Sequence, residues 1–254
     1  MQRKGGEIMA DDREKINGED VKIKISNPFL TKLENFWFHH KWKVIISAFF
    51  LIVIGVGAFQ MFTKEKYDTQ VSVATHVIYN KEDLEAFNKT LESFMPSDVN
   101  SDGKKNLAVY RYRIYSEEEI ADANKGFDEN GHPIIVAEET YIKEQISELN
   151  NTISSGQCTL MFVSAYEYQV LVDKRPSDVL LLPMSELFGE DLPEGVTENG
   201  YGVKLRDISA YGLEGFNWLP EDTVICILRK FPTVSEERYE ADKEMFKNIV
   251  EFGE

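Results

Sequence analysis

Residues 44–62 (VIISAFFLIVIGVGAFQMF) are the stretch that most limits how this chain folds. None of these residues is charged, and only Ser47 and Gln60 have clearly polar side chains. As a helix the stretch is about 28 Å long, close to the hydrocarbon thickness of a bilayer of roughly 30 Å. The sequence therefore predicts one membrane-spanning helix over 44–62. Since it carries no ionisable residue, we expect an anchor and not an ion path.

The residues before this helix are predicted to lie at the membrane surface. Residues 29–43 (FLTKLENFWFHHKWK) combine aromatic and basic side chains, which is typical of an interfacial helix. Residues 1–28 are polar and charge-rich, so we expect disorder there. A separate domain is then expected over 67–254. Translation from either Met1 or Met9 stays open, because Lys-Gly-Gly-Glu at 4–7 can be encoded by a purine-rich stretch like a ribosome-binding site.

The charges flanking the helix predict its orientation. Residues 1–43 contain 9 Lys or Arg and 7 Asp or Glu, and only Lys64 and Lys66 follow closely on the other side. The positive-inside rule then places the N-terminus in the cytoplasm and residues 67–254 outside the cell membrane. A cleaved signal peptide is the competing interpretation, but an N-terminal region of this length is far too long for one.

The predicted external domain is strongly acidic. The chain has a net charge of −16, and residues 1–43 contribute +2, so the remainder carries −18. This charge argues against binding to nucleic acid or to anionic lipid, and it suits solubility or cation binding. The two cysteines, Cys158 and Cys226, both lie in apolar runs. They fit buried thiols, although a disulfide between them would be permitted outside the cell.

Periodicity predicts an α/β fold. Alternating apolar residues over 67–79 indicate a strand, and the 3-4-3 spacing of Leu84, Phe87, Leu91 and Phe94 indicates a helix that begins at Asn80. Further strands are expected at 106–115, 158–165 and 223–231, with 190–221 mostly loop. Helices are expected near 137–154, where Gly156 ends the helix, and at the C-terminus. Strands that alternate with helices predict a mainly parallel sheet, in one body or in two small lobes.

One loop has the spacing of a calcium ligand set. Residues 98–103 fit the pattern D-x-N-x-D-G, the first half of a calcium-binding loop. The predicted ligands are the side chains of Asp98, Asn100 and Asp102, the carbonyl of Lys104 and the side chain of Asn106. The bidentate Glu of an EF-hand is missing, so a structural calcium ion would need Glu138 or Glu139 to complete its shell. An Asp/Asn/Gly-rich turn without metal is the alternative.

A second candidate site is an aromatic loop near the end of the domain. Tyr211, Phe216 and Trp218 alternate with glycines, and such a loop can line a ligand cleft. Anchoring of an irregular loop onto the core would use the same residues. The sequence contains no HExxH, GxSxG, CxxC, P-loop or GxGxxG motif. No nucleophile and base can be paired, so we expect no enzymatic activity.

Two stretches resemble a known group of proteins. NFWFHHKWKVIISAFF with FTKEKYD resembles the membrane anchor of uncharacterised single-pass proteins from clostridia-type Gram-positive bacteria, in which a D-x-N-x-D-G loop follows. Residues 146–165 are similar to the helix-Gly-strand step of extracellular solute-binding proteins. The resemblance implies a reduced, membrane-tethered relative of those proteins, although residues 67–254 are few for two full lobes. No ligand-contact motif of that family maps onto this chain.

The sequence thus favours a non-enzymatic, membrane-anchored extracytoplasmic binding module, either solute-binding or accessory to a transporter. The alternative is a structural or interaction protein that docks on a membrane or envelope partner and binds no small molecule. A cleft near Trp218 would favour the first, and a flat apolar patch would favour the second. The sequence identifies neither the ligand, nor the partner, nor the oligomeric state.

Overall fold

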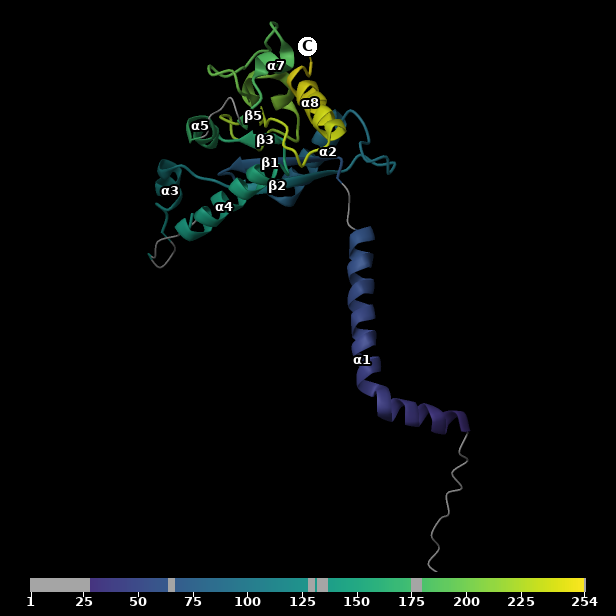
Figure 1. Cartoon of the computed structure of the whole chain (residues 1–254). Coiled ribbons are helices and arrows are strands. Elements are labelled where there is room, and N and C mark those ends of the chain that lie inside the picture. Colours follow the sequence, from purple (N-terminus) through teal and green to yellow (C-terminus); the bar gives the residue numbers. More distant parts are fainter. Residues whose placement is uncertain (1–27, 64–66, 128–130, 132–136, 175–179, 254) are drawn as a thin grey trace, which may run out of the picture. The chain divides into compact units, whose positions relative to one another are not determined.

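The structure is a computed structural model of the 254-residue chain, and it describes residues 28–63, 67–127, 131, 137–174 and 180–253 (Figure 1). The chain forms two compact units, residues 1–64 and residues 65–254.

The first unit contains one long helix. Helix α1 (Pro28–Thr63) has 36 residues, a length of about 54 Å. Within its segment Lys32–Gln60, the most apolar stretch of 18 residues has a mean hydropathy of 2.2 and is not buried. By length and composition α1 fits a membrane anchor, and its place near the N-terminus also fits a signal sequence. Figure 1 shows a bend in the N-terminal half of α1, the part predicted to be interfacial.

The second unit is built on one five-stranded sheet with the order β2-β1-β3-β5-β4. Its strands are β1 (Thr69–Thr75), β2 (Leu107–Arg113), β3 (Leu160–Val163), β4 (Val203–Lys204) and β5 (Val224–Ile227). The β1–β2 and β1–β3 pairs are parallel, and the β3–β5 and β4–β5 pairs are antiparallel. The predicted α/β class is confirmed. The sheet is mixed, so the mainly parallel arrangement is not confirmed.

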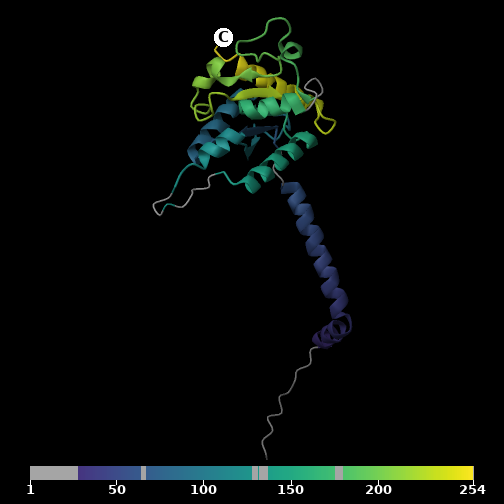
Figure 2. The same cartoon turned by 90° about the vertical axis from the view of Figure 1, so that its left-hand side faces the viewer.

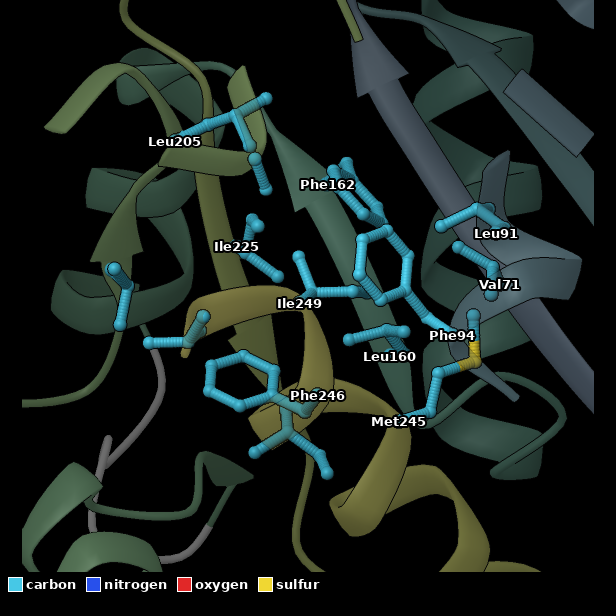
Figure 3. Packing of buried hydrophobic residues seen from close by; sticks show 14 of the residues in the cluster. Val71, Leu91, Phe94, Leu160, Phe162, Leu205, Ile225, Met245, Phe246 and Ile249 are labelled. Atoms are coloured by element: carbon cyan, nitrogen blue, oxygen red, sulfur yellow. The ribbon is translucent and has the colours of Figure 1, made fainter. Parts of the chain in front are cut away.

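Helices cover both faces of this sheet (Figure 2). Helices α2 (Lys81–Phe94) and α8 (Glu236–Val250) pack on one face. Helices α4 (Glu139–Ser155) and α5 (Ala165–Lys174) pack on the other. Figure 3 shows the core beneath α8, where four labelled side chains gather: Phe94, Leu160, Phe162 and Ile249. Strands β3 and β5 are buried on both faces, which explains their continuous apolar sequences.

Local signals set the ends of the helices. Asn80 caps α2: its side chain accepts the Asp83 backbone N–H, and the Asp83 side chain accepts the Asn80 N–H. Helix α4 ends at Gly156 in the left-handed conformation, with φ of 65°. Both signals were predicted and are confirmed. Helix α4 begins at Glu139, two residues later than expected.

The region 190–221, predicted to be mostly loop, contains an additional edge strand. β4 pairs with β5, and it leads into two 3-10 helices, η1 (Leu205–Asp207) and η2 (Ser209–Gly212). Two short helices lie elsewhere, α3 (Glu117–Ala123) and α7 (Met184–Phe188). A two-residue strand leaves no alternating pattern, so β4 was missed from the sequence.

The topology places β1 at a point where the chain changes direction across the sheet. The connection from β1 to β2 contains α2, which covers one face, and the connection from β2 to β3 contains α4, which covers the other. Ligands of open α/β sheets bind beyond the carboxyl ends of parallel strands near such a point. The crevice at this point lies between β1 and β3, so a site is expected at the carboxyl end of β1 and of its two parallel neighbours, β3 and β2.

Candidate functional site

Two arginines lie on the edge strand at this end of the sheet. Arg111 and Arg113 are two residues apart in β2, so their side chains lie on the same face of the strand. Among the described strands, β2 pairs only with β1. Arg111 is exposed to solvent and Arg113 is half-buried. The exposed side chain of Arg111 is accessible to a ligand, and that of Arg113 is partly accessible.

A small cavity opens between these arginines and the neighbouring elements. Its volume is about 50 Å³, and its lining includes Thr75 at the end of β1 and both arginines. Tyr141 and Gln145 of α4 also line it, together with neighbouring residues of β1, of β2 and of the segment after β1. A water molecule needs roughly 10–15 Å³ of such volume, so the cavity accommodates a few waters or one group of carboxylate size.

Neighbouring side chains support the two arginines. The guanidinium carbon of Arg111 lies 4.9 Å from the centre of the Tyr79 ring, a cation–π arrangement. The Tyr79 ring packs in turn on Trp218, with 5.2 Å between ring centroids. Gln145 Oε1 accepts a hydrogen bond from the backbone N–H of Arg113 at 3.2 Å. Contacts from the segment between β1 and α2, from α4 and from the aromatic loop thus limit how far the site can rearrange.

Neither arginine has a carboxylate partner within the part of the chain that the structure describes. That part contains five arginines, and the other three each form an ion pair: Arg206 with Asp207, Arg229 with Glu186, and Arg238 with Asp242. Arg111 and Arg113 are therefore the exceptions in a chain whose net charge is −16. A guanidinium without a carboxylate partner is suited to bind a carboxylate or a phosphate.

The acidic residue Glu119, on the nearby helix α3, is held by other groups. One of its oxygens lies 2.7 Å from His76 Nδ1, and the other accepts the backbone N–H of Ser116 at 2.6 Å. Burial raises the pKa of Tyr115 above its ordinary value, and the Arg113 guanidinium acts in the opposite direction. The positive charge of Arg113 thus acts on a neighbouring phenol and is not neutralised by Glu119.

The predicted calcium loop is closed by its own hydrogen bonds. Asp98 Oδ2 accepts the backbone N–H of Gly103 at 2.6 Å, and Asn100 Oδ1 accepts that of Asp102 at 3.0 Å. Asp102 Oδ1 accepts the N–H of Lys104 at 3.0 Å. Within the described ranges, no group of three or more His, Cys, Asp or Glu is placed to hold a metal. The arrangement fits the Asp/Asn/Gly-rich turn, and calcium binding stays a prediction.

A buried carboxylate outside this loop anchors it to the sheet. Asp68 is 1% exposed, and its two oxygens accept the backbone N–H groups of Asn100 at 2.9 Å and Asn106 at 2.8 Å. The Asp68 N–H donates to the Asn106 carbonyl at 2.8 Å. Sequence reasoning missed Asp68, because a single aspartate before a strand carries no motif. The predicted ligand Asn106 thus contributes its backbone to the anchoring of the loop.

The aromatic loop packs onto the core. Phe216 is completely buried, with its ring centroid 5.7 Å from those of Phe87 and Phe162. Trp218 is half-buried and also contacts Phe87, and the Tyr211 hydroxyl donates to the Leu219 carbonyl at 3.5 Å. These contacts favour the anchoring interpretation for Phe216. The Trp218 ring contacts Tyr79, which packs on Arg111. Trp218 therefore lies next to the site formed by Arg111 and Arg113, called the arginine site below.

Both cysteines are free and buried. Burial raises the pKa of the Cys158 and Cys226 thiols to about 12. They are therefore protonated and unreactive at neutral pH, as the simpler interpretation of their apolar sequences predicted. The alternative of a disulfide between them is wrong for this structure.

The arginine site itself was not predicted. Its residues lie in the strand sequence NLAVYRYRIY, where charges at alternate positions indicate a solvent-facing side or an edge strand. That signal was available, but the sequence does not reveal which strand forms the edge or that Tyr79, Tyr141 and Gln145 surround these arginines.

No family model, curated protein or solved structure matches this chain. The resemblance to solute-binding proteins therefore stays a prediction, and function must be argued from the site.

Proposed function

We propose that this chain is a non-enzymatic, membrane-anchored binding module that holds an anionic ligand at Arg111 and Arg113. The observation that carries the proposal is the pair of arginines without carboxylate partners beside a cavity of about 50 Å³ in an acidic chain. In this proposal α1 is the anchor, and the basic residues before it keep the N-terminus in the cytoplasm. The domain from residue 67 onward then meets its ligand outside the cell.

The energetics favour an anion over a neutral ligand. Two guanidinium groups on one strand face can each donate a charge-assisted hydrogen bond, worth about 1.5–3 kcal/mol. Their mutual repulsion in the free protein is relieved when an anion binds between them. Tyr79 lies against Arg111 and leaves its N–H groups free to donate in the plane of the guanidinium.

A solute such as a small dicarboxylate, or a segment of another protein, supplies the same chemistry. The first fits the predicted solute-binding or transporter-accessory role. The second fits the alternative of an interaction protein on the membrane or envelope, and the open edge of β2 favours it. A structural calcium ion in the loop of residues 98–106 is a separate proposal, which stabilises the scaffold and takes no part in ligand binding.

The test is isothermal titration calorimetry of the full chain in detergent micelles, with succinate and inorganic phosphate as probes. We expect binding of at least one probe, weakened about tenfold by Arg111→Gln or Arg113→Gln, which corresponds to about 1.4 kcal/mol. Arg206→Gln is the matched control, because Arg206 is an exposed arginine with its own acidic partners. Absence of heat with these probes and with acidic peptides would contradict the proposal.

A further inference from the structure

The hydrogen bonds of β2 show which backbone groups face outward. The Ile114 N–H donates to the Thr75 carbonyl at 3.2 Å, and the Asn106 carbonyl accepts the Asp68 N–H at 2.8 Å. In a parallel ladder, alternate residues of a strand bond the same neighbour. The even-numbered residues of β2 therefore bond to β1. The N–H and C=O groups of Leu107, Val109 and Arg111 point away from the sheet.

Gln145 of α4 closes one end of this open edge. Its side chain accepts the outward N–H of Arg113, as described above. Among the described strands, none lies against the edge from Leu107 to Arg111. An unpaired edge of this kind is a template for an added strand.

A groove runs beside this edge. Its volume is about 380 Å³, and it lies between β2 and α4, with Tyr110, Arg111 and Tyr112 on one side. Glu148 and Asn151 are on the other side. The groove shares Arg111 and Tyr112 with the small cavity. The groove has room for several residues of extended chain, and the small cavity has room for one carboxylate.

We infer that the anionic ligand is an extended acidic segment of another protein, which adds to the free edge of β2 as a further strand. This inference rests on the proposed function, and it identifies the ligand class of the same arginine site. The backbone of the segment would bond to Val109 and Arg111, and one acidic side chain would reach the cavity between Arg111 and Arg113. Main-chain bonds supply affinity in this mode, and the side-chain pockets supply specificity.

The charges around the edge favour an acidic partner over a second copy of this chain. The open edge runs from Leu107 to Arg111, so two copies that paired antiparallel about a twofold axis at Val109 would place Arg111 opposite Leu107 of the other copy. Such a pair would give Arg111 no acidic partner, whereas an acidic segment would supply one. Glu148 is the acidic residue in the groove, and its carboxylate accepts a hydrogen bond from Gln145 Nε2 at 3.4 Å.

The geometry of a strand predicts the pattern of acidic residues in the segment. Successive side chains of a strand point to opposite faces, so acids at alternate positions all lie on one face. Arg111 and Arg113 share one face of β2, and acids at positions two apart can meet both. Acids in a contiguous block would place half of their charge on the wrong face.

The experiment titrates the full chain in detergent micelles with two pools of labelled hexapeptides of equal composition, blocked at both ends. One pool has Glu at positions 2 and 4, on one face of a strand, and the other has Glu at positions 2 and 3, on opposite faces. We expect the pool with alternating Glu to bind at least tenfold more tightly. N-methylation of the peptide nitrogens that face β2 should abolish binding. Amide exchange at Val109 and Arg111 should slow, while that at Tyr110 and Tyr112 should not change.

Two variants separate this inference from the proposed function. Arg111→Gln should weaken the binding of peptides and of small anions alike. Val109→Pro removes an outward N–H of an edge strand, and it also replaces a half-buried side chain that packs on the core. In a variant whose melting midpoint stays at that of the wild-type protein, peptide binding should weaken at least tenfold and succinate binding should not change. If small anions bind but neither peptide pool binds more tightly, the inference is overturned and the proposed function survives. If neither small anions nor peptides bind, both fail.

Discussion

Asp242 of α8 is fully buried, and its carboxylate accepts a hydrogen bond from the hydroxyl of Thr159, the residue directly before β3. Thr69, the first residue of β1, donates to the other carboxylate oxygen. The Asp242 carboxylate thus ties α8 to the amino ends of two neighbouring strands. Its nearest cation is Arg238, with 3.8 Å between Arg238 Nε and Asp242 Oδ2.

This buried carboxylate predicts a pH dependence of stability. Burial raises the pKa of Asp242 from 3.8 to about 6, against the opposing effect of Thr159, Thr69 and Arg238. The folded state therefore binds this proton more tightly than the unfolded state. The resulting stabilisation is present below about pH 4 and is lost as the pH rises through 6, a change of about 3 kcal/mol. In denaturant titrations of the full chain in micelles, the free energy of unfolding of the wild-type protein should fall over this pH range by more than that of Asp242→Asn. Equal pH slopes of the two free energies would contradict the prediction.

Because the Asp68 carboxylate binds the loop of residues 98–106, we expect the stability of the domain to depend on it. Asp68→Ala should lower the free energy of unfolding by about 2–5 kcal/mol, because two backbone N–H groups lose their charged acceptor. Asp191→Ala, an exposed acid on another loop, is the control. A change of less than about 0.5 kcal/mol in the free energy of unfolding of Asp68→Ala would show that the loop keeps its conformation without Asp68.

Calcium binding by the same loop is tested separately. If the predicted ligands bind, calcium at about 1 mM should raise the melting midpoint of the full chain in micelles. The double variant Asp98→Asn with Asp102→Asn should lose the shift. An unchanged midpoint in the wild-type protein would leave the loop as a turn without metal.

Gly156 and Gly189 both have positive φ, but an added Cβ would be crowded at only one of them. At Gly156, with φ of 65°, an added Cβ would lie 2.4 Å from the Phe231 Cβ. At Gly189, with φ of 76°, it would meet nothing within 4 Å. Gly156 lies in the left-handed helical region, where the strain costs about 1–2 kcal/mol, so the added crowding should make Gly156→Ala cost clearly more than about 2 kcal/mol. Gly189 has ψ of −135°, a combination that glycine adopts far more readily than other residues, so Gly189→Ala should be destabilising through backbone strain without any crowding. A loss of about 2 kcal/mol or less for Gly156→Ala in a denaturant titration would contradict the crowding at Gly156.

Substitution of Phe216 tests whether the aromatic loop anchors itself on the core or lines a ligand cleft. Because Phe216 is completely buried among Phe87, Phe94 and Phe162, Phe216→Ala should cost about 3–5 kcal/mol of stability. Tyr211→Phe, which removes only the hydroxyl bonded to Leu219, should cost about 1 kcal/mol. A small loss in Phe216→Ala together with weaker ligand binding would instead support a cleft.

The role of α1 is open to a direct test in cells. We expect the full chain to stay in the membrane fraction after an alkaline carbonate wash, and to lose its domain to protease added outside the cell. The intact mass of the protein, which also distinguishes a start at Met1 from one at Met9, should include residues 44–62. A mature protein that begins after residue 62 would identify α1 as a cleaved signal sequence.

Sequence reasoning succeeded where the signal is local. The charge-free run 44–62, the Asn80 cap and the left-handed Gly156 each act within a few residues, and the structure has α1, α2 and the end of α4 where they predict them. The apolar runs at 158–165 and 223–231 also predicted strands, and β3 and β5 lie there. Backbone sterics, capping bonds and the apolar period decide these features without reference to the rest of the chain.

The tertiary structure alone decided which segments meet. Strand order made β2 an edge, and thereby placed Arg111 and Arg113 beside a cavity with Tyr141 and Gln145. It also buried Asp68 and Asp242, which no motif marks. Strand pairing depends on competition among all faces of the sheet and helices, so residues distant in sequence determine it. The sequence by itself therefore determined the apolar helix and the α/β elements, whereas the arginine site exists only because the fold assembles it.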